Sequence, residues 1–357
     1  MIPLPLAPSR PPGAPPAFHL LAKPSGSACN LDCAYCFFLD KEVLYPGSKF
    51  RMNDSLLEQY IRQTIEAHQE QVVNIAWQGG EPTLMGLDFF RRALALAEKY
   101  RRPGMSFLHT MQTNGTLLDD DWARFLKEHG FLVGLSIDGP REIHDHYRIT
   151  KRGTPTFDSV YAAAQTLRKF GVKFNTLTCV NRFNASRPLD VYRFLRRELG
   201  STYLQFIPIV EIKSFEATAP HAWDPARLPL VGSPEMRPDH PDSVVTPWSV
   251  DPDEYGYFLS RVWDEWLARD CGKVLVNFCE RPLRLSGVPA RQHPRTLARR
   301  HGVFADAGEI RLREVREAAR VLQAVRVPDR LLGRVPEEPS AAHAGRRTGS
   351  QLSLPGP

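Results

Sequence analysis

Residues 29–36 read CNLDCAYC and place Cys29, Cys33 and Cys36 in a C-x3-C-x2-C pattern. Three thiolates this close together can hold three irons of a [4Fe–4S] cube. An iron–sulfur cluster normally takes four cysteines, but the next cysteine in this chain is Cys179. The pattern therefore indicates a cluster whose fourth iron stays open to a ligand that the protein does not supply.

A structural zinc site and a chance pattern are the alternative interpretations of these cysteines. Zinc favours a closed set of four ligands, usually supplied as two short-spaced pairs. The nearest histidine after the motif is His68, and no second cysteine pair stands close to it in the sequence. The ligand spacing therefore favours the iron–sulfur interpretation.

The composition limits the classes of protein to which the chain can belong. Its 357 residues allow one large domain or two modest ones. No run of 18 apolar residues is present, so we expect no membrane partner. Residues 1–17 hold seven prolines, lack the pattern of a signal peptide and predict a flexible arm. Six cysteines, three of them in one motif, do not indicate a disulfide framework, so we expect a cytoplasmic protein.

The net charge of +6 comes from the C-terminal part of the chain. Residues 281–357 hold 15 Arg, no Lys and seven acidic residues, for a net charge of +8, whereas residues 1–280 carry −2. A nucleic-acid partner would require a basic face interleaved with aromatic residues, or a known binding module. The body of the chain shows neither, so we expect no nucleic-acid partner.

From residue 18 onward, strand-like and helix-like segments alternate along the chain. The strand-like segments cover residues 18–26, 72–80, 105–115, 131–139, 173–181 and 201–211. The helix-like segments between them cover residues 55–68, 87–101, 119–130, 156–171 and 188–200. Alternating β and α segments with right-handed crossovers predict a parallel sheet. We therefore predict an α/β fold, a partial (β/α)6 barrel over residues 18–211.

Three further segments follow the predicted barrel. Residues 212–250 hold seven prolines and predict a linker or a flap over the site. Residues 251–278 predict an appended helix and strand. Residues 279–357 predict an irregular Arg-rich tail, poorly packed, with scattered helix at residues 311–325.

Polar and Gly-rich motifs recur where the predicted strands end, which is where α/β barrels build their chemistry. Gly79 and Gly80 would let the backbone approach a ligand, and Glu81 or exposed peptide groups could hold an ammonium group. QTNG, at residues 112–115, and SIDG, at residues 136–139, end the next two strands, and an ordinary turn is the alternative for all three motifs. Arg148 could pair with a carboxylate, or be a solvated loop residue. Cys179 lies in an apolar strand, so we expect it to be a buried core thiol.

Together these segments resemble the anaerobic sulfatase-maturating enzymes, which are radical S-adenosylmethionine enzymes. The resemblance covers about residues 18–278 and rests on FHLLAKPSGSACNLDCAYCFFLDKE, WQGGEPTLMGLDFFRRA, QTNGTLL, FLVGLSIDGPREIHDHYR, TFDSVYAA and YLQFIPIVE. Single motifs of this set occur in many radical enzymes. The whole set, in this order, occurs in a much narrower range of enzymes.

The resemblance implies two cofactors, a [4Fe–4S] cluster and S-adenosylmethionine, whose reductive cleavage yields a radical. That radical would take hydrogen from a Cys or Ser of an unfolded or nascent sulfatase polypeptide, giving Cα-formylglycine. An electron donor such as ferredoxin or flavodoxin would reduce the cluster. Motif matching gives Cys29, Cys33 and Cys36 as cluster ligands and Gln78 as a substrate contact. It gives as S-adenosylmethionine contacts Tyr35, Gly80, Ser136, Arg148 and Leu204, beside which the residues themselves suggest Gly79, Glu81 and Asp138.

The chain departs from this family after Cys279. The family carries a C-terminal domain with further cysteines for two auxiliary clusters and an Asp that is a candidate base. This chain has no cysteine beyond Cys279, so the resemblance leaves the catalytic base unassigned. The change of composition at the same place indicates a reading-frame shift, and a natural variant with a replaced C-terminus is the alternative. A radical enzyme acting on another peptide, and a non-catalytic remnant that binds the cluster and S-adenosylmethionine, therefore remain alternative functions.

Overall fold

The computed structural model describes residues 15–39, 45, 47–213, 229–230 and 232–279. All of them belong to the first of two compact units, Met1–Arg300. The predictions for most of the Pro-rich arm, for the tail beyond Cys279 and for its helix at residues 311–325 lie outside the described residues.

The described residues form one sheet of seven parallel strands that follow one another in chain order. The strands are β1 (Leu21–Ala22), β2 (Val72–Trp77), β3 (Ser106–Thr113), β4 (Leu132–Ser136), β5 (Lys173–Val180), β6 (Tyr203–Pro208) and β7 (Leu275–Val276). Within the described part of the chain no pairing joins β7 to β1, so the sheet is open. The prediction of a partial α/β barrel is confirmed.

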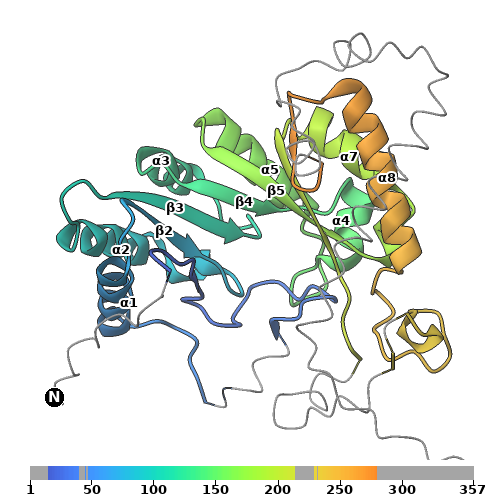
Figure 1. Cartoon of the computed structure of the whole chain (residues 1–357), viewed down its shortest axis with the longest axis horizontal. Helices are drawn as coiled ribbons and strands as arrows, with labels where there is room; N and C mark the ends of the chain where they lie inside the picture. Colours follow the sequence, from blue (N-terminus) through green and yellow to red (C-terminus); the bar gives the residue numbers. More distant parts are fainter. Residues whose placement is uncertain (1–14, 40–44, 46, 214–228, 231, 280–357) are drawn as a thin grey trace, which may run out of the picture. The chain divides into compact units, whose positions relative to one another are not determined.

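Helices connect successive strands, as the periodicity predicts (Figure 1). They are α1 (Asp54–Ala67), η2 (Pro82–Met85), α2 (Leu87–Lys99), α3 (Asp120–Glu128), α4 (Arg141–Tyr147), α5 (Phe157–Lys169), α6 (Arg182–Ala185), α7 (Pro188–Arg193), the π-helical η3 (Phe194–Glu198), η6 (Pro234–Met236) and α8 (Pro252–Arg269). Side-chain caps start several of them: Asn53 accepts a hydrogen bond from the N–H of Leu56, and Asp119 from that of Trp122. None of the described helices is long and apolar enough to cross a membrane.

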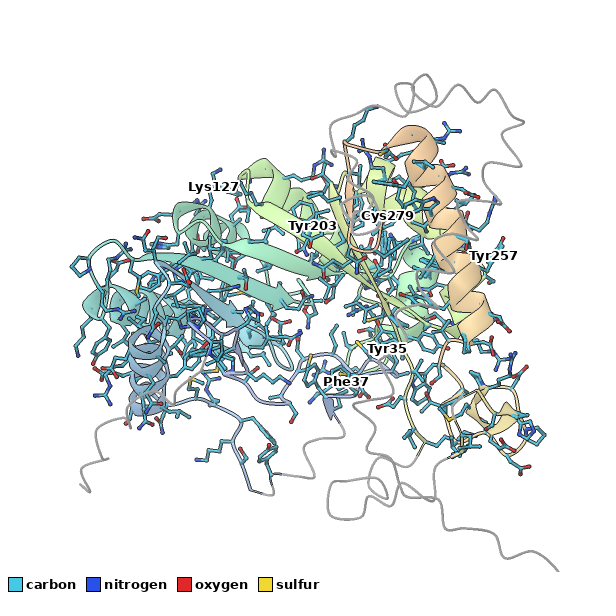
Figure 2. All side chains as sticks on the ribbon, in the orientation of Figure 1. Tyr35, Phe37, Lys127, Tyr203, Tyr257 and Cys279 are labelled. Atoms are coloured by element: carbon cyan, nitrogen blue, oxygen red, sulfur yellow. The ribbon has the colours of Figure 1, made fainter. Side chains whose placement is uncertain are left out.

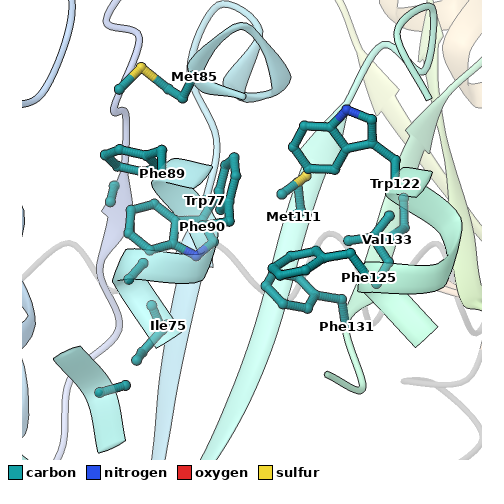
Figure 3. Packing of buried hydrophobic residues seen from close by; sticks show 14 of the residues in the cluster. Ile75, Trp77, Met85, Phe89, Phe90, Met111, Trp122, Phe125, Phe131 and Val133 are labelled. Atoms are coloured by element: carbon teal, nitrogen blue, oxygen red, sulfur yellow. The ribbon is translucent and has the colours of Figure 1, made fainter. Parts of the chain in front are cut away.

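Two apolar clusters hold the helices against the sheet. The first joins β2, β3 and β4 to α1, α2 and α3, and Figure 3 shows Trp77 and Phe90 on one side of it and Trp122 and Phe131 on the other. The second joins β4, β5, β6 and β7 to α5, α7 and α8. Because apolar burial is the dominant favourable term in folding, these two clusters hold the helices in place against the sheet.

The appended segment belongs to the same sheet. β7 pairs with β6, with Leu275 opposite Tyr203, and α8 buries Phe258 and Trp266 in the second cluster. Cys279, where the predicted tail begins, is itself buried in that cluster. In the predicted linker, the described residues include an antiparallel bridge between Ile212 and Val245.

Candidate functional site

The loop that follows β1 carries the three cysteines of the motif, all free and half-buried. Its backbone docks on the segment after β4, because the N–H of Asp32 donates to the Ile149 carbonyl at 2.8 Å. Figure 2 marks Tyr35 and Phe37 in this loop, and Tyr203 at the start of β6. The loop lies at the carboxyl edge of the sheet, because its backbone is hydrogen-bonded to the turn that follows β2 and to the segment that follows β4.

The three cysteine thiols are close enough to affect one another's charge. Burial raises the pKa of the Cys33 thiol to about 12, the charge of Arg148 lowers it, and the charges of Cys36 and Cys29 raise it. No three His, Cys, Asp or Glu side chains among the described residues could share a single metal ion. A [4Fe–4S] cluster, however, distributes its thiolates over separate irons. Three thiols that influence one another's charge, with two N–H donors on the Cys29 sulfur, fit the ligand set of this cluster.

The turn after β2 is hydrogen-bonded to the cysteine loop through its backbone. The N–H of Gly80 donates to the Gly26 carbonyl at 2.8 Å, and that of Glu81 to the Ala28 carbonyl at 2.9 Å. Gly79 has φ of 128°, and a Cβ on Gly80 would stand 2.1 Å from the Ala28 oxygen. Only glycine therefore lets this turn and the cysteine loop lie together.

The side chain of Glu81 faces inward rather than toward a ligand. It is fully buried, and its oxygens accept hydrogen bonds from Thr83, from the Thr113 hydroxyl at 2.8 Å and from the Asn114 N–H at 2.7 Å. Burial raises its pKa, and these hydrogen bonds lower it. The sequence offers either Glu81 or the peptide groups of the turn as partners for an ammonium group. Because Glu81 faces inward, only the peptide groups remain candidates.

A buried ion pair lies behind the cysteine loop. Arg148 donates through Nε and Nη2 to the two oxygens of Asp138 at 3.0 and 3.3 Å, and the pair is 9% and 1% exposed. Tyr35 donates its hydroxyl proton to Oδ2, and the N–H of Cys179 donates to Oδ1 at 3.0 Å. Asp138 is thus saturated by the chain's own donors. It holds Arg148 and Tyr35 in place and has no free oxygen for a ribose.

His144 also belongs to this network, although the sequence analysis does not single it out as a site residue. Its Nδ1 accepts from the N–H of Asp138 at 3.4 Å, and its Nε2 lies 3.1 Å from the hydroxyl of Thr156. That hydroxyl donates to the Arg148 carbonyl at 2.7 Å. Burial lowers the pKa of His144 to about 3, so the ring is neutral, which suits one nitrogen that accepts and one that donates. The H-D-H-Y-R spacing is the only local signal that could have found it.

The prediction that Cys179 is a core thiol is wrong about its surroundings. Its Sγ accepts a long hydrogen bond from Arg148 Nη2 at 3.8 Å, so the thiol faces the buried ion pair rather than an apolar cluster. Burial raises the pKa of this thiol to about 12. An apolar strand sequence misleads here, because alternate residues of β5 face the open side of the sheet rather than the helices.

The remaining predicted contacts separate into two groups. Ser136 is half-buried at the end of β4 and accepts from Gln112 Nε2 at 2.8 Å, and Gln78 is half-buried at the end of β2. Leu204, in contrast, is fully buried in the second apolar cluster. The structure does not bring its side chain to this edge, because it points toward the helices behind β6.

Residues 24–195 match the Radical SAM superfamily, and this span includes the cysteine loop and the motifs that end β2, β3 and β4. The chain carries a radical SAM domain. This superfamily uses a [4Fe–4S] cluster and S-adenosylmethionine. The three thiols of the motif lie within this matched span.

The chain is also similar to individual proteins. It is 38% identical over 266 residues to the serine-type anaerobic sulfatase-maturating enzyme of Bacteroides thetaiotaomicron, covering 74% of this chain and 61% of that enzyme. It is 36% identical over 255 residues to the cysteine-type enzyme of Clostridium novyi, covering 70% and 60%. The solved structure of native anSMEcpe with bound AdoMet and Cp18Cys peptide is 33% identical, with a TM-score of 0.58, over 72% of this chain and 63% of that one. The chain thus spans about three fifths of the length of these relatives.

Proposed function

We propose that this protein oxidises a Cys or Ser of a sulfatase polypeptide to Cα-formylglycine. The observation that carries the proposal is the grouping of Cys29, Cys33 and Cys36, the Gly79–Gly80 turn and the buried Arg148 at one edge of the sheet. The similarity to both serine-type and cysteine-type maturating enzymes supports the substrate class.

The residues at this edge have distinct roles in the proposed function. Cys29, Cys33 and Cys36 hold the cluster, and the peptide groups at Gly79 and Gly80 hold the ammonium end of S-adenosylmethionine. Arg148 has guanidinium protons beyond those that it donates to Asp138, and these bind the carboxylate of S-adenosylmethionine.

The cluster and S-adenosylmethionine, when bound, supply the power to abstract hydrogen. The hydroxyl of Ser136 binds the ribose, and Gln78 contacts the substrate. Tyr35, Asp138 and Glu81 do not bind the cofactor themselves. Their hydrogen bonds hold in place the groups that contact it.

The partners follow from the same chemistry. The substrate is an unfolded or nascent sulfatase segment, because the reacting side chain must reach the edge of the sheet that carries the cysteine loop. A reducing protein of the ferredoxin or flavodoxin class supplies electrons, and the compartment is the cytoplasm. No nucleic acid and no membrane takes part.

The test uses the full chain, reconstituted anaerobically with iron and sulfide. Peptides with Cys or Ser in a C/S-x-P/A-x-R context are incubated with S-adenosylmethionine and a reductant, and their masses are measured. The Ser peptide should lose two hydrogens, and the Cys peptide should lose one sulfur and two hydrogens and gain one oxygen. The same peptides with Ala at the target position are the controls.

Two results would favour other functions. Cleavage of S-adenosylmethionine without formylglycine on any such peptide favours a radical enzyme for another peptide. Binding of the cluster and S-adenosylmethionine without cleavage favours a remnant. The sequence has no cysteine beyond Cys279, so we expect about four irons per chain, and about twelve would show auxiliary clusters.

A further inference from the structure

A closed ring of hydrogen bonds joins the cysteine loop to the turn after β3. The hydroxyl of Thr116 donates to Asn114 Oδ1 at 2.7 Å, and Asn114 Nδ2 donates to Asn30 Oδ1 at 2.9 Å. Asn30 Nδ2 then donates to the Thr116 hydroxyl at 2.8 Å. Each group in the ring both donates and accepts, so the bonds polarise one another. The ring ties the loop to the sheet.

The ring also fixes the direction of the Asn114 amide. Asn114 is 7% exposed, and its Oδ1 accepts a second hydrogen bond, from the Thr116 N–H at 3.0 Å. Its backbone N–H donates to the buried carboxylate of Glu81. With the oxygen held by Thr116, the amide nitrogen must face the cysteine loop. There it lies 3.6 Å from Cys29 Sγ, which is hydrogen-bond distance for sulfur.

The Cys29 sulfur therefore accepts two N–H groups. The second comes from the backbone of Leu31 at 3.4 Å, a contact that any residue at that position would make. The contact from Asn114 depends on one side chain and on the ring that orients it. A substitution of Asn114 leaves the cysteines of the motif unchanged in sequence, but it also removes the hydrogen bond to Asn30 in the cysteine loop.

We propose that Asn114 is a positioning residue that raises the reduction potential of the cluster through its N–H bond to the Cys29 sulfur. The proposal rests on the proposed function, because it requires Cys29 to be a cluster ligand. Reduction adds negative charge that spreads onto the cysteine sulfurs, and an N–H dipole aimed at a sulfur stabilises that charge. Without this donor, the reduced cluster is less stable relative to the oxidised one.

The test is the midpoint potential of the reconstituted full chain, measured by titration with electron paramagnetic resonance detection and without S-adenosylmethionine. Asn114→Ala should shift the potential to more negative values. Thr116→Val keeps the amide but loses the ring, and should give a smaller shift of the same sign. Thr116→Ser keeps the hydroxyl, and Asn74→Ala alters an amide elsewhere that contacts His19, so both should match the wild type.

The outcomes distinguish this inference from the proposed function. A wild-type chain without a reducible cluster signal contradicts the proposed function and this inference with it. An intact cluster with the same potential in the wild type and Asn114→Ala overturns this inference alone. If Asn114→Ala holds no cluster, the Thr116→Val and Thr116→Ser pair decides, and equal potentials in that pair overturn it.

Discussion

Replacement of Asp138 by Asn tests whether the ion pair behind the cysteine loop supports the fold. The side chains of Asp138 and Arg148 are 1% and 9% exposed, so the change leaves a buried guanidinium without its counter-charge. Asn also brings an NH2 group against donors from Tyr35, Arg148 and Cys179. Removal of one partner of such a buried pair costs about 3–5 kcal/mol. In a domain of this size that lowers the melting temperature by roughly 6–20 °C.

The measurement is thermal and urea unfolding of the chain without cofactors, followed by circular dichroism. Asp158→Asn is the matched control, because it breaks another Asp–Arg pair, with Arg141, whose side chains are 79% and 57% exposed. Exposed pairs contribute little, so this variant should unfold with the wild type. Equal stability of Asp138→Asn and Asp158→Asn would refute the view that burial makes the Asp138–Arg148 pair essential.

Three further changes test the site and its surroundings. Gly80→Ala places a Cβ 2.1 Å from a carbonyl of the cysteine loop, so S-adenosylmethionine affinity should fall at least about tenfold, whereas Gly256→Ala, in open space on α8, should stabilise by about 1 kcal/mol. Gln112→Glu replaces the amide that donates to Ser136 by a carboxylate that accepts, and so draws the Ser136 hydroxyl proton away from S-adenosylmethionine. The affinity for S-adenosylmethionine should therefore fall, except in a Ser136→Ala background. Burial lowers the pKa of His109 to about 4, so the unfolded chain binds the extra proton and the free energy of unfolding falls as pH drops from 6.5 towards 4; His109→Phe should flatten that slope.

Each of these variants can also contradict its prediction. Unchanged S-adenosylmethionine affinity in Gly80→Ala means that the turn does not meet the cofactor. An equal effect of Gln112→Glu with and without the Ser136 hydroxyl means that Gln112 does not act through it. A pH dependence of unfolding that is the same in His109→Phe as in the wild type means that another group titrates in that range.

Local periodicity predicted the elements well because each helix and strand buries one face against a single sheet. The helix expected at residues 55–68 is α1, at Asp54–Ala67, and its cap Asn53 lies just before it. The expectation was less accurate at HDHYR, where the residues before Arg148 form the helix α4. Its buried residues, Ile143 and His144, are too few to produce a visible helical period.

The sequence names residues that the structure gathers at one edge of the sheet, but it does not reveal the contacts among them. Cysteine spacing and strand-ending glycines are local signals with a direct chemical meaning, so they located the edge. The bonds within the site join residues far apart in the chain: Tyr35 and Asp138 are 103 positions apart, and Asn30 and Thr116 are 86 apart. No local pattern encodes such pairs. Leu204 shows the opposite error, because a matching motif did not reveal which face of β6 its side chain occupies.

The sequence by itself determined the parallel α/β sheet, the three grouped thiols and the glycine turn beside them. These depend on burial periodicity, ligand count and backbone conformation, which neighbouring residues express. The tertiary structure alone decided that Asp138 and Glu81 face inward, that Cys179 joins Arg148 and that Asn114 faces the Cys29 sulfur. The physical reason is strand register. Parallel strands of different lengths end at one edge, and only their packed alignment determines which side chains meet there.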